Sequence, residues 1–186
     1  MRVFTMDTRL GPITVWESDN GLVRLDFTHA SVERIEKYYG CDIEWTNKME
    51  SVRQLDAYLN GRLFEFNLPL DIDATGTDFQ RRAWRALLTI PYGETITYAD
   101  LAARMGSPTA IRAAGQANNR NPIAIVIPCH RVIRTNGDLG GYNGGVERKR
   151  ALINMEKARM GAYHRRKLSH PNVSGIITDA EQGTIA

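Results

Sequence analysis

Residues 121–133, with the sequence NPIAIVIPCHRVI, place a strongly apolar run directly before a cysteine and a histidine. The run at 123–127 is continuous and has the length of a strand, which is typical of a strand buried on both faces. Such a strand would deliver the chain directly into Pro128, Cys129 and His130. We therefore expect the chemistry of this chain to be centred on Cys129.

The neighbours of Cys129 supply what an activated thiol needs. A free cysteine is mostly protonated at neutral pH, so attack requires a base, commonly a histidine oriented by a carboxylate. His130 is adjacent, but neighbouring side chains of an extended chain point apart, so contact requires a sharp turn at 128–131 or a bridging water. Glu156, in a segment at 147–158 with helical spacing, is the candidate that orients His130. The alternative is a buried core thiol beside a hydrogen-bonded turn histidine, which composition alone favours.

The segments upstream of this site predict helices. Residues 79–90 carry apolar side chains at helical spacing, and PYGE at 91–94 ends that helix. The segments TYADLAARM at 97–105 and TAIRAAGQANN at 109–119 predict two short helices joined by a tight turn. This pattern is typical of a helix-turn-helix, although many helical hairpins share it.

The first part of the chain predicts an antiparallel sheet followed by helices. The segments VFTMDT, ITVWES and LVRLDF are rich in β-branched and aromatic residues, and Asn20-Gly21 is a strong hairpin signal. Helical patterns follow at 31–40 and 48–60, and an extended segment follows from 62. This half therefore predicts strands first and helices second.

Together these segments predict an α+β protein of two subdomains. The first, residues 1–76, is a small antiparallel sheet with helices. The second, residues 77–160, is mainly helical and contains a winged helix-turn-helix and the loop with Cys129. We expect residues 161–186 to form a poorly ordered tail.

Charge is distributed unevenly along the chain. Residues 1–76 hold 8 Lys and Arg against 13 Asp and Glu, whereas residues 77–167 hold 16 against 6. A basic region beside an acidic one is expected when one part of a protein meets a polyanion such as DNA. A solvated surface with a local imbalance gives the same counts, so charge alone leaves both interpretations open.

Composition excludes several classes of protein. With 42% hydrophobic and 24% charged residues the chain is typical of a globular protein, and it has neither a bilayer-length apolar run nor a signal-peptide pattern. We expect no membrane contact and a cytoplasmic location. Cys41 and Cys129 are too few for a disulfide framework, and no Cys/His cluster predicts a metal site. We expect Cys41 to be structural, and we expect no metal or cofactor.

Three segments together resemble the O6-alkylguanine-DNA alkyltransferase family. They are FQRRAWRALLTIPYGETITYADLA at 79–102, NPIAIVIPCHRVI at 121–133, and GGYNGG at 140–145 in a glycine-rich loop. The resemblance covers roughly 77–157 in order and with matching spacing. It implies that the protein flips O6-alkylguanine out of duplex DNA and moves the alkyl group irreversibly to its own cysteine. Activity on O4-alkylthymine is left open.

The resemblance implies catalytic roles for five residues. Cys129 would accept the alkyl group, His130 would act as its base through a water, and Glu156 would hold His130. Asn121 would brace the turn that presents the cysteine, and Tyr98 would donate to the flipped guanine. A helix-ending asparagine and a half-buried helix tyrosine are the plainer interpretations of the last two.

The same resemblance implies residues that contact the substrate and the DNA. The backbone at Val132 and Asn143 would read the base edge, with Tyr142 lining the pocket; Asn143 replaces the small hydroxyl residue usual in the family. Arg112 would fill the gap left by the flipped nucleotide, although a phosphate contact or a solvated charge is the more common role of such an arginine. Small residues suited to close approach of DNA are Ala110, Ala113, Ala114, Gly115 and Ala117.

Other classes of protein would require different features. A thiol hydrolase or acyltransferase using Cys129, His130 and Glu156 would need a small-molecule cleft, and it leaves the basic half unexplained. A helix-turn-helix regulator would need a dimer and no reactive cysteine, and a non-transferring variant of the family would lack the cysteine. We expect the partner to be double-stranded DNA carrying alkylated guanine, bound by a protein that is monomeric in solution, with cooperative binding along DNA left open.

Overall fold

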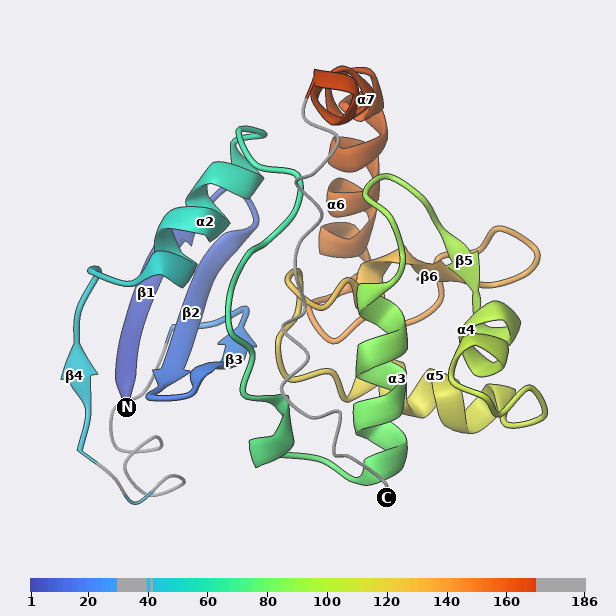
Figure 1. Ribbon diagram of the computed structural model, residues 1–186, viewed down its shortest axis with the longest axis horizontal. Coiled ribbons are helices and arrows are strands. Elements are labelled where there is room, and N and C mark those ends of the chain that lie inside the picture. Colours follow the sequence, from blue (N-terminus) through green and yellow to red (C-terminus); the bar gives the residue numbers. More distant parts are fainter. Residues whose placement is uncertain (30–39, 41, 170–186) are drawn as a thin grey trace, which may run out of the picture.

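The computed structural model describes residues 1–29, 40 and 42–169, which form an α+β protein (Figure 1). A four-stranded sheet from the N-terminal residues lies on one side of the molecule, and helices of the C-terminal half lie on the other. The predicted fold class is thereby confirmed. The helix predicted at 31–40 lies, except for residue 40, outside the described residues, as does Cys41.

The large sheet has the strand order β3-β2-β1-β4. Because side chains alternate along a strand, Ile13 and Val15 of β2 face the main core, whereas Trp16 packs with Val3 in a smaller cluster. The first three strands form the two predicted antiparallel hairpins, and the fourth pairs parallel with the first, a short pairing that no sequence pattern predicted. The strands are β1 (Arg2–Thr8), β2 (Gly11–Ser18), β3 (Gly21–Asp26) and β4 (Glu44–Trp45).

Helix α2 (Glu50–Leu59) packs on β1 and buries Leu55 and Tyr58 in the core. After this helix the chain runs along the free edge of β3. The backbone N–H of Leu22 donates to the Pro69 carbonyl at 2.9 Å, and the Asp71 N–H donates back to the Leu22 carbonyl at 2.9 Å. A short 3-10 turn, η1 (Ile72–Ala74), then leads into the C-terminal half.

Capping boxes begin two helices of the C-terminal half. Thr77 and Gln80 cap the first, and Thr97 and Asp100 cap the helix that opens the helix-turn-helix. Two short parallel strands, β5 and β6, lie side by side, and β6 directly follows the turn η2 that begins with Cys129. In chain order the elements are α3 (Asp78–Leu88), β5 (Ile96–Thr97), α4 (Tyr98–Arg104), α5 (Ile111–Asn119), η2 (Cys129–Arg131), β6 (Val132–Ile133), α6 (Val146–Ala158) and α7 (Met160–Ser169).

Two predicted elements differ from the structure. The apolar run at 123–127 is buried as expected, but it is a tight turn with isolated bridges, so the prediction of a strand there is wrong. The prediction of a poorly ordered tail is wrong for residues 161–169, because α7 is helical and Tyr163 is buried against the core. Residues 170–186 lie outside the described residues.

One continuous core joins the two halves. It includes Ile13 and Leu25 of the sheet, Leu87 of α3 and Ile123 of the turn. The N–H of Leu25 also donates to the Pro122 carbonyl at 2.9 Å, so β3 lies directly against the start of the turn that leads to the cysteine. The N-terminal half therefore supports the segment on which the site is built.

Candidate active site

Cys129 is the first residue of η2 and follows the buried turn directly. Its side chain is 4% exposed. Burial raises the pKa of the Cys129 thiol to about 11, although a hydrogen bond with the Asn121 side chain and the charge of Lys149 oppose the rise. The thiol is therefore protonated at neutral pH, and attack by its sulfur requires a base that removes the proton.

Asn121 holds the turn before Cys129 at both ends. Its Nδ2 donates to the Ile127 carbonyl at 2.8 Å, and its Oδ1 accepts from the Ile123 N–H at 3.0 Å. Between them Ile125 has a φ of 73°, a left-handed conformation that β-branched residues rarely adopt. Strain of this kind persists only where the surroundings over-determine the backbone, and it clusters at functional sites. The contacts of Asn121 are those that bracing the turn requires.

The structure brings together His130 and Glu156, the two residues that the sequence analysis paired. Nε2 of His130 lies 2.7 Å from Oε1 of Glu156, and the two side chains are 0% and 1% exposed. Because an ionised carboxylate only accepts hydrogen bonds, Nε2 carries the ring proton and Nδ1 keeps its lone pair. Nδ1 is buried without a hydrogen-bond partner among the described residues. It is therefore the free basic atom of the ring, and burial lowers the pKa of His130 so that the ring is neutral at neutral pH.

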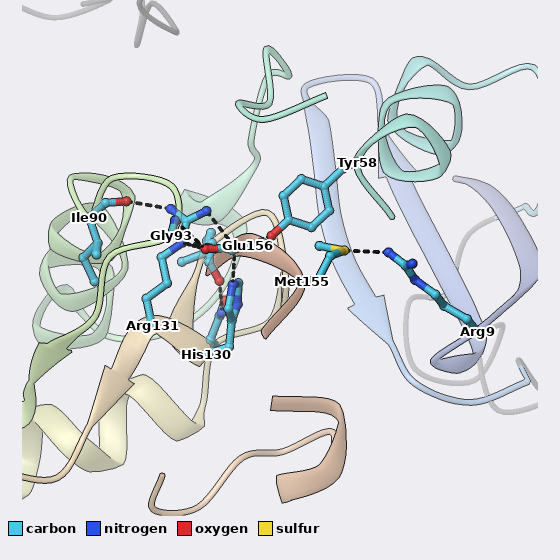
Figure 2. A network of polar contacts seen from close by, with 10 residues as sticks. Arg9, Tyr58, Ile90, Gly93, His130, Arg131, Met155 and Glu156 are labelled. Atoms are coloured by element: carbon cyan, nitrogen blue, oxygen red, sulfur yellow. Dashed lines mark hydrogen bonds and ion pairs between the residues drawn. The ribbon is translucent and has the colours of Figure 1, made fainter. Parts of the chain in front are cut away.

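Glu156 accepts hydrogen bonds from four residues, as Figure 2 shows. Nε and Nη2 of Arg131 donate at 2.9 and 3.0 Å, the Gly93 N–H donates at 2.8 Å, and the Tyr58 hydroxyl donates to Oε1. Burial alone would raise the pKa of Glu156, but His130 and Arg131 outweigh it and hold this pKa well below its usual range. The carboxylate stays ionised, which fixes the orientation and tautomer of the imidazole.

Lys149 of α6 ties the glycine-rich loop to the segment after the cysteine. Its Nζ donates to the Val132 carbonyl at 2.6 Å, to the Leu139 carbonyl, and to the Gly141 carbonyl at 3.5 Å. The side chain is fully buried, and burial lowers the pKa of Lys149 to about 8. One amine therefore binds the carbonyl of Val132 in β6 and two carbonyls of the glycine-rich loop.

A negative charge on the Cys129 sulfur would raise the pKa of the two tyrosines expected around the substrate, Tyr98 and Tyr142. Tyr98 is half-buried, and a side chain at Gly140 would place its Cβ only 2.9 Å from the Tyr98 hydroxyl. Tyr142 packs on Phe27 with ring centroids 5.9 Å apart, and its hydroxyl has no hydrogen-bond partner among the described residues. Burial raises the pKa of both tyrosines, so both keep their protons as donors.

The two residues expected to read the base edge come from opposite ends of the glycine-rich loop. Val132 is buried in β6, and its carbonyl already accepts a hydrogen bond from Lys149. Asn143 is exposed in the loop. Their expected roles involve backbone atoms, so the burial or exposure of their side chains does not test these roles.

The helix-turn-helix presents four of the expected DNA-contacting residues at least partly to solvent. Arg112 and Ala113 are exposed on the first turn of α5, while Ala110 and Gly115 are partly exposed. The residues at 110, 113 and 115 around Arg112 are small, whereas Ile111 beside it is large and 44% exposed. Small side chains at these three positions would allow a DNA backbone to approach this turn.

The expectation that Ala114 and Ala117 face DNA is wrong. Both lie in the core, 0% and 2% exposed, because this face of α5 packs on α3. The indole N–H of Trp84 also donates to the Ala117 carbonyl at 3.0 Å. Small residues at these positions serve helix–helix contact rather than DNA contact.

Three buried polar residues around Cys129 and Glu156 were not singled out from the sequence. The role of Arg131 could have been predicted locally, because it is the one charged residue in 121–133 and a charge in an apolar segment needs a buried partner. Tyr58 had no such local signal, since 98 positions separate it from Glu156. Lys149 had none either, because it lies among other basic residues of α6 that are exposed or half-exposed.

Across residues 1–29, 40 and 42–169, no helix is long and apolar enough to cross a membrane, and no three His, Cys, Asp or Glu side chains gather as metal ligands would. What these residues do contain is a helix-turn-helix, a buried cysteine in the segment that follows it, and a histidine next to that cysteine in the chain that is bonded to a buried carboxylate. This combination of fold and site is the one expected of a DNA-binding protein that uses a cysteine as its nucleophile.

Comparisons with known proteins assign the family within that class. The model of the 6-O-methylguanine DNA methyltransferase DNA binding domain matches residues 78–158, and that of the ribonuclease-like domain matches residues 1–72. The chain belongs to the 6-O-methylguanine DNA methyltransferase family.

Relatives in two distant organisms match over nearly their whole length. The methylated-DNA--protein-cysteine methyltransferase of Mycobacterium tuberculosis is 46% identical over 158 residues, 85% of this chain and 93% of its own. The protein of the same name from Methanosarcina barkeri is 46% identical over 82% of this chain and 94% of its own. A crystal structure of Mycobacterium tuberculosis OGT in complex with DNA covers 86% of this chain and 94% of its own, at 44% identity and a TM-score of 0.74.

Proposed function

We propose that this protein repairs DNA by direct reversal, moving an alkyl group from O6 of guanine to the sulfur of Cys129. The observation that carries the proposal is the state of His130, whose Nε2 is fixed by Glu156 while its buried Nδ1 is free. A protonated thiol next to a neutral histidine with a free lone pair is the arrangement that general-base activation needs. The names of the relatives, methylated-DNA--protein-cysteine methyltransferases, support the same reaction.

The groups of the site account for every bond and proton in the proposed transfer. Through a bridging water, Nδ1 of His130 takes the thiol proton, and the sulfur attacks the alkyl carbon while the bond from that carbon to guanine O6 breaks. The resulting imidazolium is stabilised by Glu156, and Tyr98 donates to the departing guanine anion. The product is a thioether on Cys129, which water does not cleave. Each molecule therefore acts once, and the reaction consumes no cofactor.

Burial of Cys129 requires that the nucleotide leave the base stack before it reacts. Arg112 would fill the gap, and the small side chains of Ala110, Ala113 and Gly115 would allow the DNA backbone to approach α5. The backbone of Val132 and Asn143 and the ring of Tyr142 would contact the flipped base. The excess of basic residues in the C-terminal half favours phosphate contacts, so affinity should fall steeply with salt. We further propose that the protein is a cytoplasmic monomer.

A titration with DNA in excess tests this function. An oligonucleotide duplex with one O6-methylguanine is mixed with limiting protein, and the lesions removed per protein molecule are counted after digestion to nucleosides. We expect removal to stop at one lesion per chain. Continued turnover would favour a thiol hydrolase using the same three residues, and binding without removal would leave only lesion recognition.

A further inference from the structure

Tyr58 belongs to the N-terminal half but reaches the polar network of the C-terminal half. It lies near the end of α2 and is fully buried. Its hydroxyl donates to Oε1 of Glu156, the same oxygen that accepts from Nε2 of His130 (Figure 2). The hydroxyl and the imidazole therefore share one carboxylate oxygen.

Aromatic packing fixes the direction of the Tyr58 hydroxyl. The ring lies 4.8 Å from that of Phe66 and 6.0 Å, edge to face, from that of Tyr92, measured between ring centroids. A phenylalanine at position 58 would keep these contacts, because only the hydroxyl oxygen is lost. The hydrogen bond to Glu156 can therefore be removed without emptying the space that the ring fills.

We propose that Tyr58 is a positioning residue for alkyl transfer: by sharing Oε1 of Glu156 with His130, it sets how strongly the carboxylate holds the catalytic base. The N-terminal half would thus act on the chemistry of the other half through one hydrogen bond. This inference rests on the proposed function, and it adds to it a residue of the N-terminal half, outside the three sequence segments at 79–102, 121–133 and 140–145.

The direction of the effect follows from the charge on Oε1. Without the Tyr58 donor, more negative charge remains on the oxygen that faces His130, which raises the pKa of the imidazole. A histidine that holds its proton more tightly is protonated, and inactive as a base, up to a higher pH. The titratable and charged groups that interact with His130 and Glu156 are Tyr58 of α2, Tyr92 after α3, Arg131 of η2, Tyr142 of the glycine-rich loop and Lys149 of α6, and Cys129 is the chain neighbour of His130.

A second tyrosine provides a matched control. The hydroxyl of Tyr163, on α7, donates to Oε1 of Glu65 at 2.8 Å, so it also joins the two halves through a tyrosine–glutamate bond. Glu65 is exposed and is not bonded to His130. Tyr163→Phe therefore removes the same kind of contact without changing the carboxylate at the site.

The test compares wild type, Tyr58→Phe and Tyr163→Phe by two measurements. The first is the single-turnover rate of methyl transfer against pH, and the second is the NMR titration of the His130 ring without DNA. For Tyr58→Phe we expect the acidic limb and the His130 titration to move up by about half to one pH unit, a three- to ten-fold loss of rate on that limb. For Tyr163→Phe we expect neither to move.

Either of two results would overturn the role of Tyr58. One is a Tyr58→Phe protein with the pH profile and the His130 titration of wild type; the other is an equal shift in both variants. Failure of the proposed function has a different signature, because wild type itself would then transfer no methyl group at any pH. The NMR comparison would still decide whether Tyr58 sets the proton affinity of His130.

Discussion

Nε of Arg131 lies 2.9 Å from Oε2 of Glu156, and the two side chains are only 9% and 1% exposed. Nη2 of Arg131 also donates to Oε1 of Glu156 at 3.0 Å, the oxygen that accepts from Tyr58 (Figure 2). This buried ion pair keeps Glu156 ionised, and an ionised Glu156 fixes the ring proton of His130 on Nε2. The free Nδ1 on which the proposed chemistry depends is therefore a consequence of the Arg131–Glu156 ion pair.

Replacing Glu156 by Gln should impair both stability and transfer. The change leaves the Arg131 charge buried without its partner, which costs about 3–5 kcal/mol of unfolding free energy. It also frees the imidazole to adopt the wrong tautomer, so we expect transfer to fall by about 100-fold or more. Urea denaturation and single-turnover transfer measure the two effects.

The matched control is Glu65→Gln, which changes the exposed carboxylate bonded to Tyr163 and should change the unfolding free energy by less than about 1 kcal/mol. Equal losses of unfolding free energy in the two variants would contradict the role of Glu156.

The stability that Glu156 contributes should depend on pH in a defined direction. Its pKa is lower in the folded protein than in the unfolded chain, so the contribution is fully present above the unfolded pKa, about 4.3. It is lost as pH falls toward the folded pKa. The difference in unfolding free energy between wild type and Glu156→Gln should therefore shrink below about pH 4. A difference that stays constant from pH 7 to pH 3 would show that ionised Glu156 is not its source.

Replacing Cys129 by Ala should separate chemistry from recognition. The sulfur is the proposed acceptor, whereas affinity arises from basic side chains and α5, so transfer should vanish while binding to alkylated DNA stays within about two-fold. Mobility shift and transfer assays on the same duplex measure both. A parallel loss of binding would mean that the thiol is needed to form the pocket itself.

Lys149→Met should loosen the glycine-rich loop. The substitution keeps the aliphatic stem but leaves buried carbonyls, among them that of Val132, without their donor, which costs about 2–4 kcal/mol. Lys157→Met changes an exposed lysine of the same helix and should be nearly neutral. Urea denaturation, with limited proteolysis across 137–145, compares them. Similar stabilities would show that the amine does not hold the loop.

Much of this fold could be predicted from local patterns, because hairpins and amphipathic helices are encoded by neighbouring residues. Asn20-Gly21 marked the turn between β2 and β3, and helical spacing marked α3. The turn at 123–127 could not be predicted from hydrophobicity, because burial was the same for strand and turn, and the bonds of Asn121 decided between them.

Long-range contacts account for most of the remaining differences. Strand β4 consists of two residues whose pairing with β1 depends on the rest of the sheet. α7 follows α6 in a polar segment, and it is anchored by Tyr163 packing on Phe64 and Tyr92, which are far away in sequence. At the site, the pairing of His130 with Glu156 could be predicted from the residues of the sequence and from the family resemblance, whereas the contact of Tyr58 was visible only once α2 had been placed.

Arg112→Ala should weaken the extrusion of the damaged nucleotide. If the guanidinium fills the gap in the duplex, its loss matters most where the base pair is intact, because a mismatched base is easier to turn out. We expect the rate of transfer to fall several-fold more on a paired O6-methylguanine than on a mismatched one. An identical loss on both duplexes would assign Arg112 to a phosphate contact.

The central claim is that Cys129 itself becomes the alkyl carrier. The most direct test is the intact mass of the protein after incubation with excess duplex DNA bearing one O6-methylguanine, followed by peptide mapping. We predict a gain of one methylene unit per chain, located on Cys129 and never exceeded with longer incubation. An unchanged mass in a protein that still removes the lesion, or a methyl group on any other residue, would contradict the account.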